Sequence, residues 1–293
     1  MQGNNANRHE TFRCRQLRHQ GQRRDSMESG DVMLHYHYFD VIDSTNAYLQ
    51  REQQETDIRN WIVSANQQTA GKGMASNGWE SEAGKNLTFS LAVDVSFLPA
   101  ERQFLLSEAV PLGIIEVLDE VISDDFEGMS FLAEAVRLES MPSKLSIKWP
   151  NDIYYENHKL AGILINSTIK ANMMGVSIIG IGLNVNQMKF QDWPTHPISL
   201  KLISGMDYDL QLLLKQIVEH VKTKVELLKS NPTAIEHAYL ERLFRYQTWA
   251  DYVVDGKTLR LFMTGIDSFG RLQLVDEQQQ LHSFEIKQIK FLI

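Results

Sequence analysis

A glycine-rich stretch is the first part of the chain whose residue types could do chemistry. The run NQQTAGKGMASNGWE, residues 66–80, places Gly71, Gly73 and Gly78 around Lys72 and has a tryptophan near its end. Glycine loses much backbone entropy when it becomes ordered, so three glycines in so short a span need a reason. A plain mobile loop is one interpretation. The other interpretation is a backbone that passes close to a phosphate, whose negative charge Lys72 would neutralise.

A second stretch, KWPNDIYYENHKLAGILI at 148–165, combines four kinds of functional group. A strand-like run ends there because Pro150 cannot continue a hydrogen-bonded ladder. Asn151 and Asp152 follow at the strand end, where ligand sites of sheet proteins collect. Lys159 precedes a buried strand, which predicts that its ammonium lies near the sheet edge. Each residue alone is compatible with an ordinary turn or surface, but the combination indicates a site.

Two further motifs carry weaker signals. In GIGLNVN, residues 180–186, small glycines are followed by Asn184 and Asn186 at a strand end, where a ligand could approach the backbone. In DSTN, residues 43–46, Ser and Thr are common helix caps and need no ligand to explain them.

The elements that must position these residues alternate along the chain. Apolar alternation and β-branched residues predict strands at 34–42, 61–66, 86–95, 145–149, 159–168 and 175–185. Helical spacing predicts helices at 43–52, 101–122, 209–229 and 232–245, with Pro111 as a kink in the second. The segment 122–144 is predicted to be a structural helix with loose ends. Short strand runs separated by turns after residue 247 predict a small all-β barrel.

Composition restricts the class of protein. The chain of 293 residues has a net charge of −8, which argues against broad binding of nucleic acid. The single Cys14 excludes an internal disulfide framework and a cysteine-based zinc site, and it fits a reducing compartment such as the cytoplasm. No apolar run of about 18 residues is present, so we expect no membrane span.

The N-terminal residues differ from the rest. The first 26 residues carry six arginines against Glu10 and Asp25, a balance of +4 that leaves −12 for the remainder. Such a polar segment cannot bury enough surface to fold alone. We predict that residues 1–33 are a disordered tail, or that the protein starts at Met27 or Met33. A targeting presequence or a nucleic-acid arm is the alternative.

Taken in order, DSTN, QTAGKG with a tryptophan, KWPND with KLAGIL, and GIGLNVN resemble the biotin protein ligases from about residue 35 onward. The resemblance implies an α+β fold, in which a mixed β-sheet flanked by helices forms a biotin/lipoate ligase-like catalytic core at 34–246. A small C-terminal SH3-like β-barrel would follow at 247–293. Repressor members carry an N-terminal DNA-binding domain, and the expectation here is the monofunctional form, with no DNA partner, as a monomer or weak homodimer.

The activity that the resemblance implies has two steps. Biotin and ATP, with Mg²⁺, form biotinyl-5′-AMP and pyrophosphate. A lysine of a carrier protein, such as the biotin carboxyl carrier protein of acetyl-CoA carboxylase, then attacks the mixed anhydride.

Site residues follow from the matched motifs. Lys159 and Lys72 match lysines that screen the phosphate, a task suited to a compact point charge. Asp152 matches a carboxylate that acts on Mg²⁺ or on the incoming lysine, and these three are the expected catalytic residues. The expected biotin-binding residues are Ser44, Thr45, Asn46, Gln68, Gly71, Lys72, Gly73, Met74, Lys159 and Gly162. The expected ATP- and adenylate-binding residues are Trp79, Asn151, Asp152 and Asn184.

Two other classes of function compete with this prediction. A lipoate–protein ligase performs the same adenylation on a different acid, but its usual RRxSGGG-type loop is absent here. The other class is a non-catalytic protein that binds biotin or a nucleotide. Its only support is the middle of the glycine-rich loop, where many family members carry additional Arg or Gly residues and this chain has Met74, Ala75 and Ser76. This replacement predicts weaker retention of the adenylate.

Overall fold

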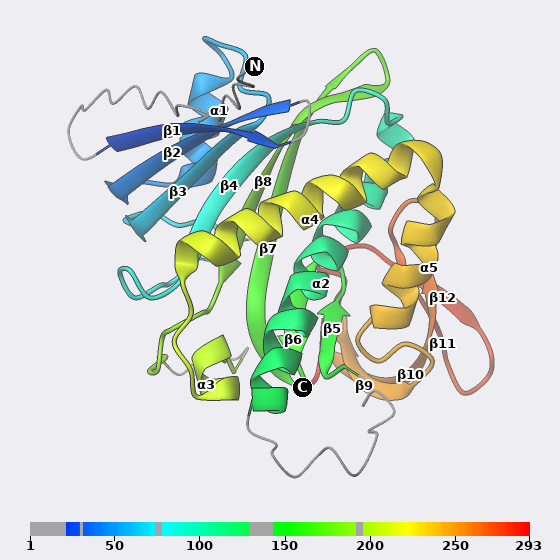
Figure 1. Ribbon diagram of the computed structural model, residues 1–293. Coiled ribbons are helices and arrows are strands. Elements are labelled where there is room, and N and C mark those ends of the chain that lie inside the picture. The colour runs from blue at the N-terminus through cyan, green and yellow to red at the C-terminus, as the bar shows by residue number, and fades with distance from the viewer. Residues whose placement is uncertain (1–21, 30–31, 74–77, 129–142, 192–195) are drawn as a thin grey trace, which may run out of the picture.

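The computed structural model describes residues 22–29, 32–73, 78–128, 143–191 and 196–293, and its main feature is one large mixed sheet (Figure 1). The eight strands are β1 (Gln22–Ser29), β2 (Val32–Ile42), β3 (Trp61–Gln68), β4 (Leu87–Asp94), β5 (Leu145–Lys148), β6 (Asp152–Tyr155), β7 (His158–Lys170) and β8 (Met173–Leu183). Their order is β1-β2-β3-β4-β8-β7-β6-β5. Only β2 and β3 run parallel, and the other neighbours are antiparallel.

Helices cover the two faces of this sheet unequally. The long helices α2 (Phe104–Gly128) and α4 (Leu210–Ser230) cross one face, and α5 (Pro232–Arg242) packs beside α2 (Figure 1). The short helix α1 (Thr45–Glu52) lies on the opposite face, where Leu49 packs with Val63, Ala92 and Ile178. Neighbouring residues of a strand point to opposite faces, so β3, β4 and β8 supply apolar side chains to the clusters on both faces. The helices η2 (Ala100–Arg102) and α3 (Leu200–Ser204) are single turns.

The prediction of a disordered N-terminal tail needs a correction for the last part of that segment. Residues 22–29 form β1, which pairs with β2 from Gln22 opposite Phe39 to Ser29 opposite Val32. The disordered tail predicted for 1–33 therefore does not include this strand, while residues 1–21 lie outside the described part. The hydrogen bonds between paired strands are made by backbone groups. A polar segment with few apolar side chains can therefore still pair with the open edge of β2.

A second, smaller sheet follows α5. Its five antiparallel strands are β9 (Trp249–Val254), β10 (Lys257–Ile266), β11 (Leu272–Val275), β12 (Leu281–Phe284) and β13 (Ile289–Phe291), in the order β12-β11-β10-β9-β13. This arrangement confirms the predicted β-rich C-terminal unit and is consistent with an SH3-like fold. The expected barrel is not closed by hydrogen bonds among the described strands, because β12 and β13 each pair on one side only.

Direct contacts join the two sheets. The indole Nε1 of Trp149 donates a buried hydrogen bond to the carbonyl oxygen of Gly270 at 3.0 Å. In the segment that leads from α5 to β9, the amide of Phe244 donates to the carbonyl of Ile147 at 2.9 Å. The C-terminal unit is therefore anchored on the β5–β6 hairpin, which contains the KWPND motif.

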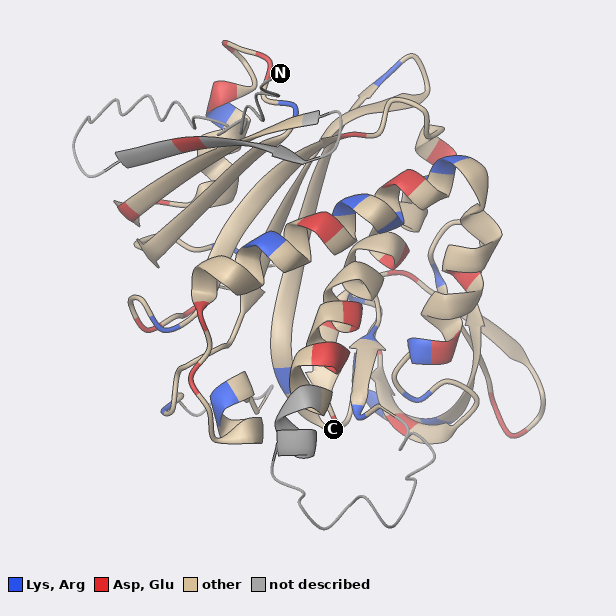
Figure 2. Ribbon diagram, in the orientation of Figure 1, with Lys and Arg blue, Asp and Glu red and all other residues tan. Residues whose placement is uncertain are grey.

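Charged residues gather on the helices and loops. Figure 2 shows both signs along α4, whereas the central strands of the main sheet carry few charges. Among the described residues, no helix has the length and apolar character needed to cross a membrane.

Candidate active site

The floor of the site is made of small residues on three adjacent strands. Ser90 on β4 lies opposite Gly180 on β8, and Gly182 on β8 lies opposite Gly162 on β7. All four positions lie on the face of the sheet that α1 covers. The larger neighbours Phe89 and Ile181 belong to the core beneath α2 and α4. Small side chains on one face and large ones on the other leave a hollow over the middle of the sheet.

A cavity of about 180 Å³ occupies this hollow. Its lining residues are Ser44, Thr45, Asn46, Gln68, Lys72, Gly73, Gly78, Trp79, Phe89, Ser90, Asp152, Lys159, Gly162, Ile163, Leu164, Gly180, Ile181, Gly182 and Ile286. Most of the predicted biotin-binding residues thus line one cavity, although they come from three separate parts of the chain, 44–46, 68–73 and 159–162.

Hydroxyl and amide groups form one end of the cavity. The Gln68 Oε1 atom accepts from the backbone amide of Thr45 at 2.8 Å and from its hydroxyl at 3.2 Å. The Thr45 hydroxyl also lies 2.9 Å from the buried hydroxyl of Ser90. Ser44 caps α1 by accepting from the amide of Ala47, which fixes the start of the helix at this end.

Asn46 supplies a donor at this polar end. Its Oδ1 accepts from Gln50 and Asn166, both at 2.9 Å. Its buried Nδ2 has no hydrogen-bond partner among the described residues. A Cβ atom on Gly180 would lie 3.1 Å from that nitrogen, so the glycine keeps the space beside it open. An unpaired buried donor is costly, and a ligand acceptor in the cavity would satisfy it.

An ion pair forms the other end. Lys159 Nζ donates to Asp152 Oδ2 at 2.6 Å, and the two side chains are 20% and 18% exposed. Asp152 begins β6 and Lys159 lies near the start of β7, so the hairpin formed by these two strands brings them together. A Cβ atom on Gly162 would lie 3.3 Å from Lys159 Nζ, which places the ammonium over the glycine floor.

The glycine loop is closed at its base. The amide of Trp79 donates to the carbonyl of Gly71 at 3.1 Å, and Lys72 forms an antiparallel bridge with Gly78. A side chain at position 71 would collide with the Trp79 carbonyl at 2.8 Å, so glycine is needed there. Lys72 is exposed and lines the cavity. The predicted residue Met74 lies outside the described residues.

Trp79 lies over the glycine floor. A Cβ atom on Gly182 would approach the indole ring to 2.3 Å, and one on Gly162 would approach it to 3.2 Å. The glycines of GIGLNVN and KLAGIL therefore permit the ring to approach the sheet closely. Its Nε1 is buried and has no hydrogen-bond partner among the described residues. Trp79 thus lines the cavity, and its assignment to the adenylate stays a prediction.

The predicted residues Asn151 and Asn184 do not line the cavity. Asn184 Nδ2 donates to the carbonyls of Ile198 at 3.1 Å and Lys159 at 3.4 Å, so it ties the start of β7 to the segment before α3. Asn151 is buried, and its Oδ1 has no partner among the described residues.

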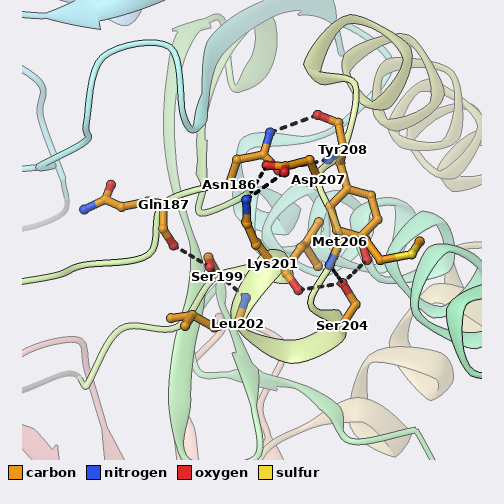
Figure 3. Close-up of polar contacts among 10 residues, drawn as sticks. Asn186, Gln187, Ser199, Lys201, Leu202, Ser204, Met206, Asp207 and Tyr208 are labelled. Atoms are coloured by element: carbon orange, nitrogen blue, oxygen red, sulfur yellow. Dashed lines mark hydrogen bonds and ion pairs between the residues drawn. The ribbon is translucent and has the colours of Figure 1, made fainter.

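Asn186 also supports the fold. Figure 3 shows its amide bonded at both atoms to the backbone of Tyr208, with each contact at 2.9 Å. In the same view, Ser199 donates to the carbonyl of Gln187 and accepts from the amide of Leu202. The asparagines of GIGLNVN therefore organise the loops around α3.

Several residues of the cavity lining were not among the predicted site residues, and Ser90 and Ile286 are two of them. Ser90 is a polar residue in the middle of the apolar strand β4, and this break in the pattern was a usable signal. Ile286 comes from the loop between β12 and β13 of the C-terminal sheet and reaches the cavity. Nothing in the local sequence around Ile286 indicates that contact.

A metal centre made only of protein ligands is not found. Among the described residues, no group of three or more His, Cys, Asp or Glu side chains could hold a metal ion. Among the described residues that line the cavity, Asp152 is the one carboxylate, and one of its oxygens accepts a hydrogen bond from Lys159.

Comparison with known proteins places the chain in a family. A family model for the biotin/lipoate A/B protein ligases matches residues 38–184, which is half of the chain, and the chain belongs to that family. It is 27% identical to the bifunctional ligase/repressor BirA of Escherichia coli (strain K12), over 80% of this chain and 67% of that protein. It is 30% identical to the biotin--[acetyl-CoA-carboxylase] ligase of Mycobacterium tuberculosis, over 49% of this chain and 47% of that protein.

Solved structures show the same fold. The biotin protein ligase from Aquifex aeolicus in complex with biotin and ATP aligns with a TM-score of 0.67 at 18% identity, over 88% of this chain and 98% of that chain. The ligase from Leishmania major in complex with biotinyl-5-AMP aligns with a TM-score of 0.55 at 19% identity, over 85% of this chain and 98% of that chain.

Proposed function

We propose that the protein is a biotin–protein ligase, which uses ATP to attach biotin to a lysine of a carrier protein through biotinyl-5′-AMP. The observation that carries this proposal is the two-ended cavity. One end offers the hydroxyls of Thr45 and Ser90 and the unpaired donor of Asn46, and the other end offers the Lys159 ammonium. Biotin has a matching shape, with a ureido ring at one end and a carboxylate at the other.

In the first step, a carboxylate oxygen of biotin attacks the α-phosphorus of ATP. The new oxygen–phosphorus bond forms biotinyl-5′-AMP, and the bond to the bridging oxygen breaks, so that pyrophosphate leaves with the electron pair. Two anions must meet in this step, and fixed cations in a shielded cavity lower the barrier to their approach. Lys159 is held over the glycine floor by Asp152, and Lys72 lies on the facing loop.

In the second step, the lysine amine of the carrier attacks the acyl carbon of the adenylate. The amide bond forms, AMP leaves with the electron pair, and the amine loses a proton. Asp152 is the carboxylate among the described residues that line the cavity, and we assign to it the attraction and orientation of the incoming ammonium. The expected carrier is a biotin carboxyl carrier protein.

Mg²⁺ fits this cavity only when it is bound together with the nucleotide. Magnesium in ATP sites is commonly held by one or two carboxylates together with substrate phosphates. Asp152 would supply the single protein carboxylate, through the oxygen that is not bonded to Lys159. The ion would then neutralise phosphate charge beside the two lysines.

The lone Cys14 fits a reducing compartment, and we place the reaction in the cytoplasm.

The polar end of the cavity favours biotin over lipoate. A ureido ring needs fixed donors and acceptors, whereas the dithiolane ring of lipoate cannot satisfy the buried donor of Asn46. A buried polar group left unpaired by the wrong ligand discriminates strongly between acids of similar length.

A pyrophosphate-release assay with ATP, Mg²⁺ and either biotin or lipoate tests the proposal. We expect release that depends on biotin, and transfer of biotin to the lysine of an added carrier domain. Faster release with lipoate would establish the lipoate ligase alternative. Tight binding of biotin without any release of pyrophosphate would establish the non-catalytic alternative.

A further inference from the structure

The orientation of the Asn46 amide decides which group the polar end of the cavity presents to a ligand. An asparagine amide has an acceptor oxygen and a donor NH₂ group of similar size, so its shape fits either way round. Its neighbours must therefore set the orientation. The function proposed above uses the Asn46 donor and assigns no role to the residues that orient it.

Two half-buried amide side chains from different elements hold the Asn46 oxygen. Gln50 lies one turn further along α1, and its Nε2 donates to Asn46 Oδ1 at 2.9 Å. Asn166 lies on β7, and its Nδ2 donates to the same oxygen at 2.9 Å. Because both neighbours direct an NH₂ group at Asn46, its oxygen faces them and its Nδ2 remains for another partner.

The Asn46 Nδ2 atom borders the cavity floor. The residue is 5% exposed, and this nitrogen has no partner among the described residues. A Cβ atom on Gly180 would lie 3.1 Å from it and 3.4 Å from Ser90 Oγ, so both polar atoms border the space above Gly180. Since all three residues line the cavity, a ligand in this space would meet both atoms.

The Ser90 hydroxyl supplies the opposite kind of group. The Thr45 hydroxyl donates its one hydrogen to Gln68 Oε1 at 3.2 Å, so Ser90 is the donor in the 2.9 Å contact between the two hydroxyls. The Ser90 oxygen is then left to accept from a ligand. The space above Gly180 is thus bordered by a donor from Asn46 and an acceptor from Ser90, which match the adjacent carbonyl and N–H groups of a cyclic urea.

We infer that Gln50 and Asn166 are positioning residues that determine the specificity of the cavity, because they fix Asn46 with its donor toward a ligand carbonyl. The inference rests on the proposed function for the identity of that ligand as biotin. A carboxylate at position 50 or 166 only accepts hydrogen bonds, so it would attract the Asn46 NH₂ group and turn its oxygen toward the cavity. The cavity would then select a ligand donor in place of a ligand acceptor.

Titration calorimetry of the full chain with biotin and with 2-iminobiotin tests this assignment. In 2-iminobiotin, a protonated imino nitrogen that donates replaces the ureido oxygen that accepts. We expect Asn166→Asp to bind biotin about ten-fold more weakly than the wild type and to gain affinity for 2-iminobiotin, because two acceptors that face each other stay unpaired. Gln50→Glu should shift the preference in the same direction, and it decides the matter should thermal unfolding show that Asn166→Asp is not folded.

The charge of the new carboxylate must be separated from the turn of the Asn46 amide. In an Asn46→Ala background, Asn166→Asp should leave the ratio of the two affinities unchanged, because no amide remains to turn. Thr168→Asp is the matched control in the wild-type background. It adds a charge at an exposed position two residues further along β7, and it should keep the wild-type preference.

Two results would overturn the inference and leave the proposed function standing. One is an unchanged preference in folded Asn166→Asp and Gln50→Glu proteins. The other is a shift of preference that persists without the Asn46 amide. Failure of the wild type to bind biotin would overturn the proposed function, and the inference, which rests on it, would fall as well.

Discussion

At the scale of single residues, the Asp152–Lys159 pair is the feature on which the proposed chemistry depends. The carboxylate accepts from the ammonium at 2.6 Å and so orients it over Gly162, without removing its charge from the cavity. A partly buried cation in a fixed position costs little reorganisation when negative charge develops beside it.

Lys159→Ala should therefore slow adenylate formation. Removing one stabilising donor of this kind costs about 2–4 kcal/mol of transition-state stabilisation. The measurement is the single-turnover rate of pyrophosphate release with biotin and ATP. Lys170→Ala, at the exposed far end of the same strand β7, is the control that should keep the wild-type rate. A wild-type rate in a well-folded Lys159→Ala protein would remove Lys159 from the mechanism.

At the scale of elements, strands β4, β7 and β8 make the cavity by placing small residues side by side. Ser90, Gly162, Gly180 and Gly182 lie on three hydrogen-bonded strands. Helix α1 begins at the edge of this floor and supplies the polar end. The arrangement needs the register of all three strands, because a slip of one residue would turn large side chains toward the cavity.

Gly182→Ala tests the floor. The new methyl group would lie 2.3 Å from the indole of Trp79, and overpacking of this kind costs about 1–3 kcal/mol. We expect Trp79 to move and biotin affinity to fall by that amount in titration calorimetry. Gly175→Ala is the matched variant on β8, since its methyl group would meet Thr168 away from the cavity. Equal losses in both variants would indicate general damage to the strand and contradict the role of the floor.

Helix α2 carries a buried acid whose titration affects stability. Burial raises the pKa of Glu108 to about 8, repulsion from Glu236 adds to the rise, and attraction to Arg102 opposes it. Tyr239 of α5 lies close enough to feel its charge. Since the ordinary pKa of a glutamate side chain is 4.5, the folded protein binds this proton more tightly than the unfolded chain does. The contribution of Glu108 to stability therefore falls as the pH rises from about 4.5 to about 8.

Glu108→Gln should remove that dependence. At pH 5 the variant and the wild type should unfold at similar denaturant concentrations. At pH 8.5 the variant should be more stable by on the order of 2 kcal/mol, because it carries no buried charge. Urea unfolding at the two pH values measures the difference. A stability difference that does not change between them would show that Glu108 is already ionised or solvated at pH 5.

At the scale of the whole molecule, the C-terminal sheet is part of the site as well as a neighbour of it. Ile286 lines the cavity, and Gly270 accepts a hydrogen bond from Trp149 of the KWPND motif. Gly270 has φ of +83°, and a Cβ atom there would lie 2.1 Å from the ring of Phe104 on α2. One glycine thus connects the C-terminal sheet to both the main sheet and its covering helix.

Gly270→Ala should loosen this junction. The left-handed backbone and the collision with Phe104 together should cost about 2 kcal/mol or more of unfolding free energy. Gly256→Ala separates the two causes, because Gly256 has φ of +76° with open space around it. Chemical denaturation of both variants gives the comparison. A loss in Gly270→Ala no larger than that in Gly256→Ala would show that packing against Phe104 contributes nothing.

Much of the fold could be predicted from local patterns. Alternating apolar residues predicted β3, β4, β7 and β8 close to their observed bounds, and helical spacing predicted α4. The pairing of β4 with β8 could not be predicted in this way, because Leu87 and Leu183 are far apart in sequence. Strand order depends on how apolar faces pack together in space. A short window of sequence does not contain that information.

The sequence by itself determined the kinds of group at the site. It also determined that Asp152 and Lys159 lie close together along the chain, and one short hairpin joins them. Only the tertiary structure decided which groups share the cavity. It brought Ser90 and Ile286 to the wall, and it used Asn184 and Asn186 to hold loops. An amide bonds equally well to a ligand or to a backbone carbonyl, and the residue type alone does not distinguish the two.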